Sequence, residues 1–450
     1  MDTIVAIATP PGRGGIGIVR LSGTKALAIA GAMFFISGKN AAKKLAHGQM
    51  TLGEIRADEF SDLGYVAVFN APRSFTGENV AEFHCHGGMR ILEGVVKACL
   101  LRGARLAEPG EFTKRALLNG KTDLAGAEGV IDMINAESAA AVRAASDMLN
   151  GKLGADVRAL QDRIGILIEN TEAVLDFPEE TEDETLPDGA STVLNLAETT
   201  RGMLAAAHAG HMAKYGVDVV ILGKPNAGKS SLLNAFLKKE RAIVSAQAGT
   251  TRDLVTDSIE YDGVKINFTD SAGLRETKDE IEKSGVERAK KAASTADLII
   301  MVEDDTEKTE SSPSDFYSYT NGDRGVVTVK NKCDLTGKGY GLTFADGICT
   351  ARVSAKDNCG IEELLKFTAN IYKNAETGTT SALVTSPRHI SCLNVCLEAL
   401  LSANAGYAAG LADCVLIDLR RAYDALGQIT GTTAGENLID AIFSRFCVGK

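Results

Sequence analysis

The fold of the chain's central part is decided by the stretch Gly223-Lys224-Pro225-Asn226-Ala227-Gly228-Lys229-Ser230-Ser231. It matches a phosphate-binding loop, in which a glycine and four further residues precede Gly-Lys-Ser. Apolar residues 217–222 before it predict a buried strand, and residues 231–237 after it predict a helix. Backbone N–H groups at the start of such a helix hold phosphate oxygens. A chance glycine-rich turn is the poorer interpretation, because it explains neither flanking element.

The neighbouring motifs supply the parts of a nucleotide and metal site. Lys229 is expected on the β- and γ-phosphates, and the Ser230 hydroxyl on Mg²⁺. Asp270 follows a predicted strand and offers a carboxylate to the Mg²⁺ shell, while Gly273 offers an N–H to the γ-phosphate. Thr251 is the expected sensor of the γ-phosphate and of Mg²⁺.

A later motif selects the base. The tetrapeptide Asn331-Lys332-Cys333-Asp334 follows a predicted strand, and the Asp334 carboxylate can accept two hydrogen bonds from guanine N1–H and N2–H₂. Adenine lacks that pair of donors, so the loop predicts GTP over ATP. The late loop Ser354-Ala355-Lys356 is expected to touch the base. The expected nucleotide-binding residues are Asn226, Ala227, Gly228, Lys229, Ser230, Ser231, Thr250, Thr251, Asp270, Gly273, Asn331, Lys332, Asp334, Ser354, Ala355 and Lys356.

Composition sets broad limits. A length of 450 residues suggests about three domains. There is neither an apolar run long enough to span a membrane nor a cationic, apolar leader, and nine scattered cysteines predict reduced thiols in a cytoplasmic protein. The net charge of −11 argues against a protein that coats nucleic acid, but it allows a local basic patch.

The first 118 residues predict an α+β domain with strands at 3–8, 16–21, 65–69 and 81–86, ahead of any helical run. Residues 12–17 form a Gly-x-Gly-x-x-Gly sequence, but a strand follows where a dinucleotide-binding fingerprint needs a helix, so that function is rejected. His84, Cys85 and His86 invite a zinc site. No second ligand pair stands nearby in the sequence, so an ordinary strand is the better interpretation.

Helix-period apolar residues predict helical segments at 125–149, 153–175 and 190–209, and helical sequence resumes at Pro387. The acidic stretch 176–189 predicts a solvated loop, with a carboxylate site as the alternative. The predicted domains are residues 1–118 (α+β), 119–215 (helical), 216–376 (α/β with the phosphate loop) and 377–450 (helical).

The hydrolytic machinery departs from that of simple switch GTPases. Leu274 stands where many of them place a water-orienting glutamine, and carboxylates follow at Asp279, Glu280 and Glu282. The side-chain carbonyl of Asn226 could ligate a monovalent cation, although a turn-forming asparagine is the plainer interpretation.

Motifs outside the phosphate loop give the chain a specific resemblance. It resembles the MnmE (TrmE) family of bacterial tRNA-modification GTPases over nearly its whole length, in residues 3–23, 74–78, 86–88, 109–113, 118–124 and 446–450. The resemblance implies an N-terminal folate-binding domain that drives homodimerisation and a helical domain into which the GTPase domain is inserted. It also implies a K⁺-dependent GTP cycle. With an FAD-dependent partner, MnmG, the family forms the 5-carboxymethylaminomethyl group on wobble uridine 34 of tRNA from a one-carbon unit of 5-formyl- or methylene-tetrahydrofolate.

The same resemblance implies roles for particular residues. It implies that Glu282 orients the attacking water, that K⁺ is held by Asn226, Ser245, Gln247 and Thr250, and that folate is held by Arg20, Glu78, Lys121 and Lys450. Cys447, near the C-terminus, has two interpretations. It is either a small buried residue of the core or a reactive thiol close to Lys450.

A second function class is an RNA-binding switch GTPase of ribosome assembly without chemistry of its own. It leaves the N-terminal motifs and the terminal Cys-Val-Gly-Lys without a use, and no basic RNA-binding domain follows the GTPase region. The modification enzyme is therefore the preferred hypothesis.

Overall fold

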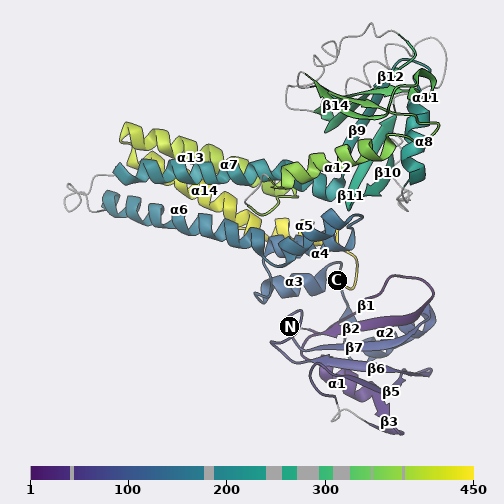
Figure 1. Cartoon of the computed structure of the whole chain (residues 1–450). Helices are drawn as coiled ribbons and strands as arrows, with labels where there is room; N and C mark the ends of the chain where they lie inside the picture. Colours follow the sequence, from purple (N-terminus) through teal and green to yellow (C-terminus); the bar gives the residue numbers. More distant parts are fainter. Residues whose placement is uncertain are drawn as a thin grey trace, which may run out of the picture. The chain divides into compact units, whose positions relative to one another are not determined.

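The computed structural model describes residues 2–40, 45–176, 187–239, 256–270, 293–307, 325–345, 348–377 and 381–450 (Figure 1). Contacts divide the chain into two compact units. The first comprises Met1–Ile131, Met148–Asp162 and Tyr423–Lys450, and the second comprises Asp132–Asp147 and Arg163–Ala422. Each unit is therefore assembled from segments that lie far apart in the sequence.

The N-terminal part of the first unit is a sheet of eight strands among the described residues, in the order β4-β3-β5-β6-β7-β2-β1-β8. The pairing is antiparallel except between β1 and β8. The strands are β1 (Ile4–Ile7), β2 (Gly14–Ser22), β3 (Phe34–Ile36), β4 (Lys39–Asn40), β5 (Met50–Arg56), β6 (Ser61–Phe69), β7 (Val80–Gly87) and β8 (Arg105–Leu106). The four strands predicted from the sequence are confirmed.

Helices also occur in this region, so the prediction that no helical run precedes residue 118 was wrong. The structure has α1 (Ala26–Met33), α2 (Met89–Leu101) and α3 (Glu111–Leu118). In α2, Leu92, Val95, Val96 and Cys99 are buried in one core with the sheet. Their spacing of three, four and seven residues is the helical period, and this signal was present in the sequence.

The helices of the first unit bring the end of the chain against residues near position 124. Buried Leu124 and Ala127 of α4 (Leu124–Ile134) form a core with Phe443 and Phe446, which lie at the end of α15 (Glu436–Phe443) and just after it. The helical segment predicted at 125–149 is in fact two helices, since α4 ends at Ile134 and α5 (Ala139–Leu149) starts after a short break. There the Ser138 hydroxyl accepts a hydrogen bond from the Ala141 N–H at 3.2 Å, as an N-cap does.

The second unit contains a seven-stranded sheet among its described residues, in the order β10-β11-β9-β12-β13-β15-β14. The five inner strands run parallel, and the two edge strands are antiparallel to their neighbours. The strands are β9 (Val217–Gly223), β10 (Thr256–Tyr261), β11 (Val264–Asp270), β12 (Leu298–Asp304), β13 (Gly325–Asn331), β14 (Gly341–Ala345) and β15 (Ile348–Arg352).

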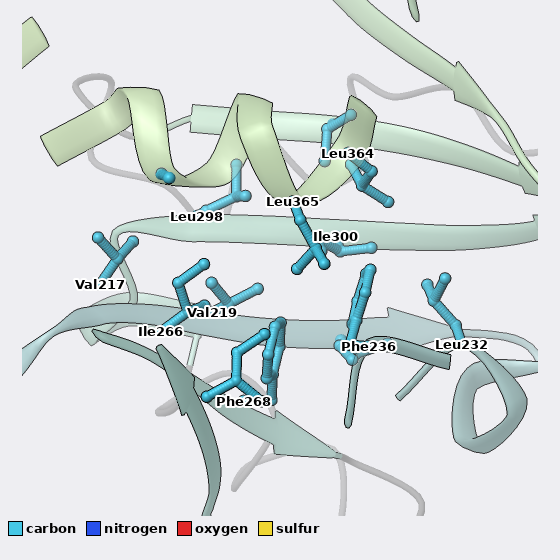
Figure 2. Packing of buried hydrophobic residues seen from close by; sticks show 14 of the residues in the cluster. Val217, Val219, Leu232, Phe236, Ile266, Phe268, Leu298, Ile300, Leu364 and Leu365 are labelled. Atoms are coloured by element: carbon cyan, nitrogen blue, oxygen red, sulfur yellow. The ribbon is translucent and has the colours of Figure 1, made fainter. Parts of the chain in front are cut away.

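Helices α8 (Lys229–Lys239) and α12 (Ile361–Thr377) contribute to the core of this sheet (Figure 2). Phe236 of α8 stacks on Phe268 of β11 with ring centroids 4.8 Å apart, and Leu364 and Leu365 of α12 are fully buried in the same core. Apolar residues fill the inner strands because helices cover a parallel sheet on its faces. This confirms the predicted α/β fold.

Four long helices also lie in the part of the chain that the structure describes. They are α6 (Lys152–Asp176), α7 (Pro187–Tyr215), α13 (Pro387–Ala409) and α14 (Ala412–Thr430), of which α7 and α13 lie side by side (Figure 1). Helix α7 ends at Tyr215, directly before β9. The phosphate loop is therefore joined to the helical region through a single strand.

Candidate functional site

The phosphate loop joins β9 to α8, and its backbone needs glycine. Gly228 has a φ of 95°, and a Cβ built there would lie 2.2 Å from Asn331 Nδ2. A side chain at this position would be strained and would also displace Asn331. Asn226 has a φ of 64°, a left-handed conformation that asparagine adopts readily.

Lys229 lies at the start of α8, and its ammonium turns back onto the loop. Lys229 Nζ donates to the carbonyl oxygens of Gly223 and Lys224, each at 2.8 Å. Ser230 and Ser231 are exposed in the first turn of α8. A lysine ammonium and backbone N–H groups at a helix start together form a site for an anion such as a phosphate.

Asn331 holds three predicted loops together. Its Nδ2 donates to the Ala227 carbonyl of the phosphate loop at 3.1 Å, and its Oδ1 accepts from the Ala355 N–H of the late loop at 3.1 Å. The side chain is almost fully buried. The loops meet because the carboxyl ends of the parallel strands β9, β13 and β15 lie at one edge of the sheet.

The proposed base-binding residues lie beside Asn331. Lys332 has a φ of 67°, and the Cys333 N–H donates to the Val353 carbonyl at 3.2 Å. These features turn the chain into the short helix α11 (Cys333–Thr336), where Asp334 is exposed in the first turn. The Asp334 carboxylate is thus free of the core and accessible to a ligand.

The late loop is fixed by its own hydrogen bonds. Ser354 and Cys359 exchange backbone hydrogen bonds at 3.0 and 3.1 Å, and the Ser354 hydroxyl accepts from the Asp357 N–H at 3.1 Å. Ala355 is tied to Asn331, and Lys356 is exposed. The structure therefore brings these predicted residues to the same sheet edge as the phosphate loop.

On the metal side, Asp270 ends β11 and is in register with Ile221 of β9, next to the phosphate loop. The backbone of Asp270 therefore lies at the same sheet edge as the phosphate loop. The remaining predicted residues lie outside the described part of the chain. They are Ser245, Gln247, Thr250, Thr251, Gly273, Leu274, Asp279, Glu280 and Glu282.

A second group of predicted residues gathers where the C-terminal tail meets the N-terminal sheet. Pro109 and Val448 form an antiparallel bridge, and the Phe112 N–H donates to the Lys450 carbonyl at 3.1 Å. A Cβ on Gly449 would lie 2.3 Å from the Ile7 carbonyl oxygen, so glycine is needed for this close contact. Cys447 is exposed, which contradicts the interpretation of its thiol as a buried core group.

Arg20 lies on β2 close to that tail. Its Nε donates to Glu82 Oε1 at 2.7 Å, and its guanidinium lies 5.8 Å from the centre of the Phe112 ring. Glu82 also lies 3.3 Å from His84 Nε2. Burial pushes the pKa of Glu82 up, but His84 and Arg20 outweigh it and hold the pKa below its usual range. Phe112 thus contacts the Arg20 guanidinium with its ring and the Lys450 carbonyl with its backbone N–H.

Glu78 and Lys121 form the other half of this group. Glu78 Oε2 accepts from the Ser22 hydroxyl at 2.7 Å and from Arg115 Nη1 at 3.0 Å. Lys121 Nζ donates to the Pro72 carbonyl at 3.1 Å, and its Cγ would lie 3.4 Å from a Cβ on Gly77, the neighbour of Glu78. Glu82, the partner of Arg20, and Arg115, the partner of Glu78, were not predicted, because no local sequence pattern marks an ion pair between distant residues.

The histidines of the rejected zinc site each face a carboxylate. His86 Nδ1 lies 2.6 Å from Asp62 Oδ1, and His84 faces Glu82. Within the residues that the structure describes, no group of three or more histidine, cysteine or acidic side chains is arranged to hold a metal ion. In the same residues no helix is both long and apolar enough to cross a membrane.

Comparison with known proteins covers the whole chain. The family described as the MnmE helical domain matches residues 124–447, and the GTP-binding protein TrmE N-terminus matches residues 3–121. The tRNA modification GTPase MnmE of Moorella thermoacetica is 40% identical over 462 residues, and that of Pseudomonas fluorescens is 42% identical over 459 residues. Each comparison covers 100% of this chain and 99% of the relative.

A solved structure, the G domain of the FeoB iron transporter of T. maritima, covers 34% of this chain and 98% of its own, at 24% identity and a TM-score of 0.26. This likeness does not establish a shared fold. The full-length relatives and the two family matches, however, agree with the loops described above, and the chain belongs to the MnmE family of tRNA modification GTPases.

Proposed function

We propose that this chain hydrolyses GTP to drive the formation, with an FAD-dependent partner (MnmG), of the 5-carboxymethylaminomethyl group on wobble uridine 34 of tRNA. The main support is that Asn331 joins the three loops predicted to bind a nucleotide. The chain also matches an MnmE relative over its full length. In this proposal the one-carbon unit comes from a tetrahydrofolate, and the protein acts in the cytoplasm. A ribosome-assembly switch would give the docked C-terminal tail no function.

The test is to delete the gene in its own host and to measure modified wobble uridine in total tRNA by mass spectrometry. We expect the modification to disappear and to return with the wild-type gene, but not with Lys229→Ala. If tRNA from the deletion strain carries the normal modification, the ribosome-assembly function becomes the better one.

In the proposed nucleotide site, Lys229 contacts the β- and γ-phosphates, and Ser230 and Asp270 hold Mg²⁺. The ammonium of Lys229 is already paired with two loop carbonyls, so a phosphate oxygen exchanges one set of hydrogen bonds for another. Thr251 and Glu282 would complete the site as the γ-phosphate sensor and the residue that orients the water.

Asn226 is the proposed side-chain ligand of K⁺, together with Ser245, Gln247 and Thr250. A cation there would supply the positive charge that other GTPases take from an arginine. We expect Asn226→Gly, which permits the left-handed backbone but lacks the carbonyl, to lower kcat in KCl about 10²-fold and to bind GDP normally. Asn226→Ala should lower kcat to the same extent, but alanine is also strained in the left-handed conformation of this position. Equal hydrolysis in NaCl and KCl by the wild-type protein would contradict this role.

The folate site is proposed at Arg20, Glu78, Lys121 and Lys450. Arg20 and Lys450 can pair with folate carboxylates, and Glu78 can accept from the pterin N–H groups. We expect Arg20→Ala and Glu78→Ala each to weaken 5-formyltetrahydrofolate binding about tenfold or more by calorimetry. The matched control is Arg56→Ala on β5, where the guanidinium pairs with Glu54 away from the tail. Unchanged affinity in the two variants would remove these residues from the site.

The proposed homodimer would use the open face of the N-terminal sheet. Met50, Leu52, Leu63 and Tyr65 on β5 and β6 are between 45% and 65% exposed, and Leu52 lies directly opposite Tyr65 in the register. A patch of large apolar residues on one sheet face marks an interface more often than free surface. Sedimentation equilibrium should give twice the chain mass, and a monomer at micromolar concentration would contradict the dimer.

A further inference from the structure

The base-recognition loop, residues 331–336, is held from one side by two acidic residues at the end of β12. Neither Asp304 nor Asp305 belongs to a nucleotide motif. The strands β12 and β13 are parallel and in register up to Asp304 and Asn331, so the end of β12 lies beside the start of the loop. This neighbour relation places two carboxylates against the loop.

Asp304 fixes the ammonium of Lys332. Asp304 Oδ2 accepts from Lys332 Nζ at 2.6 Å, and the side chain of Asp304 is only 12% exposed. Its other oxygen, Oδ1, accepts from the Thr306 hydroxyl at 2.6 Å and from the Thr306 N–H at 3.0 Å. The carboxylate is thus held at both oxygens, and its direction toward Lys332 does not depend on a ligand.

Partial burial raises the pKa of Asp304, but hydrogen bonds from Lys332 and Thr306 outweigh burial and lower the pKa to about 2. Asp304 is therefore an anion across the whole neutral range, and the pair with Lys332 is a charge-assisted hydrogen bond.

Asp305 holds the far end of the same loop. Its N–H donates to the Asn331 carbonyl at 2.9 Å, and its Oδ2 accepts from the Thr336 hydroxyl at 2.7 Å. The side chain of Asp305 is 2% exposed. Residues 331, 332 and 336 of the loop are thus held in place without a nucleotide. Asp305 holds residues 331 and 336, whereas Asp304 holds the side chain of Lys332.

We propose that Asp304 is a positioning residue for the nucleobase, because it holds the Lys332 side chain in the conformation in which a purine ring lies against it. This inference rests on the proposed function of the loop as the guanine site. A lysine fixed at its ammonium presents its methylene groups as an apolar strip. The Lys332 side chain has then already lost its rotamer entropy in the free protein, so nucleotide binding carries no further entropy cost for this side chain.

The role of Asp304 differs from that of Asp334, and the difference can be measured. Asp334 accepts from the base edge in the proposed site, so part of its effect depends on the 2-amino group of guanine. Asp304 acts through the lysine and the ring face, so its loss should weaken GDP and IDP equally, since hypoxanthine keeps the ring but lacks the 2-amino group.

The experiment measures binding of mant-GDP and mant-IDP to the full-length protein, and kcat and KM for GTP hydrolysis. We expect Asp304→Asn to raise both dissociation constants and KM by about tenfold, with kcat changed less than about twofold. Asp304→Glu keeps the negative charge and should recover most of the affinity. The matched control is Glu362→Gln, which breaks the exposed 3.0 Å pair with Lys239 in the same unit and should change neither constant.

Two outcomes separate this inference from the assignment of the loop. If Lys332→Ala weakens mant-GDP while Asp304→Asn does not, the loop binds the base and the positioning role of Asp304 is overturned. If neither Lys332→Ala nor Asp334→Asn changes affinity, the proposed base site itself fails. A lower melting temperature of Asp304→Asn with unchanged nucleotide binding would reduce Asp304 to a structural residue and overturn the proposal.

Discussion

Asp334→Asn should lose GTP affinity by about 10²-fold or more and should prefer xanthosine triphosphate. In the proposed base site the Asp334 carboxylate accepts from guanine N1–H and N2–H₂, and an asparagine would place an N–H₂ group against the second donor. Xanthine carries a carbonyl at that position and fits the asparagine amide. Because Asp334 is exposed in the first turn of α11, the substitution removes no core contact.

The measurement is competition of GTP and XTP against mant-GDP, followed by turnover of each nucleotide at saturation. Glu362→Gln serves again as the control for loss of a carboxylate elsewhere on the same unit. Wild-type affinity for GTP in Asp334→Asn would show that another group reads the base edge.

Cys447→Ser should abolish tRNA modification in the cell while GTP hydrolysis and folate binding stay at the wild-type level. The tail is held by its backbone, through the bridge at Val448 and the bonds from Gly110 to the Cys447 carbonyl and from Phe112 to the Lys450 carbonyl. The exposed Cys447 thiol takes no part in these contacts. Serine therefore keeps the tail in place but lacks the reactivity of a cysteine side chain in covalent or proton-transfer chemistry.

The assay is complementation of the deletion strain, with wobble nucleosides measured by mass spectrometry. Cys414→Ser on α14 is the matched control, since Cys414 is also an exposed free cysteine. Modification at the wild-type level by Cys447→Ser would leave the thiol without a chemical role. A lowered melting temperature or weakened folate binding in the variant would point to a structural role of the tail instead.

Much of the proposed nucleotide site could be located from the sequence, because each of its motifs is local. The phosphate loop needs glycines, a lysine and a hydroxyl at fixed spacing. Asp270 and Asn331 stand at the ends of apolar strands, where parallel strands place their loops on one edge. The helices α6 and α7 were predictable from their helical period. The helices α1, α2 and α3 were missed, and the break before α5 depends on one serine cap.

The sequence by itself determined the class of each domain, the nucleotide chemistry and the positions of the motif residues, because local spacing encodes them. Only the tertiary structure decided the partners of those residues. Arg20 meets Glu82 across 62 residues, Arg115 meets Glu78 across 37, and Lys332 meets Asp304 across 28. Strand order and register set these pairs, as they set the contact of Val448 with Pro109, and an ion pair between distant residues leaves no periodic pattern along the chain.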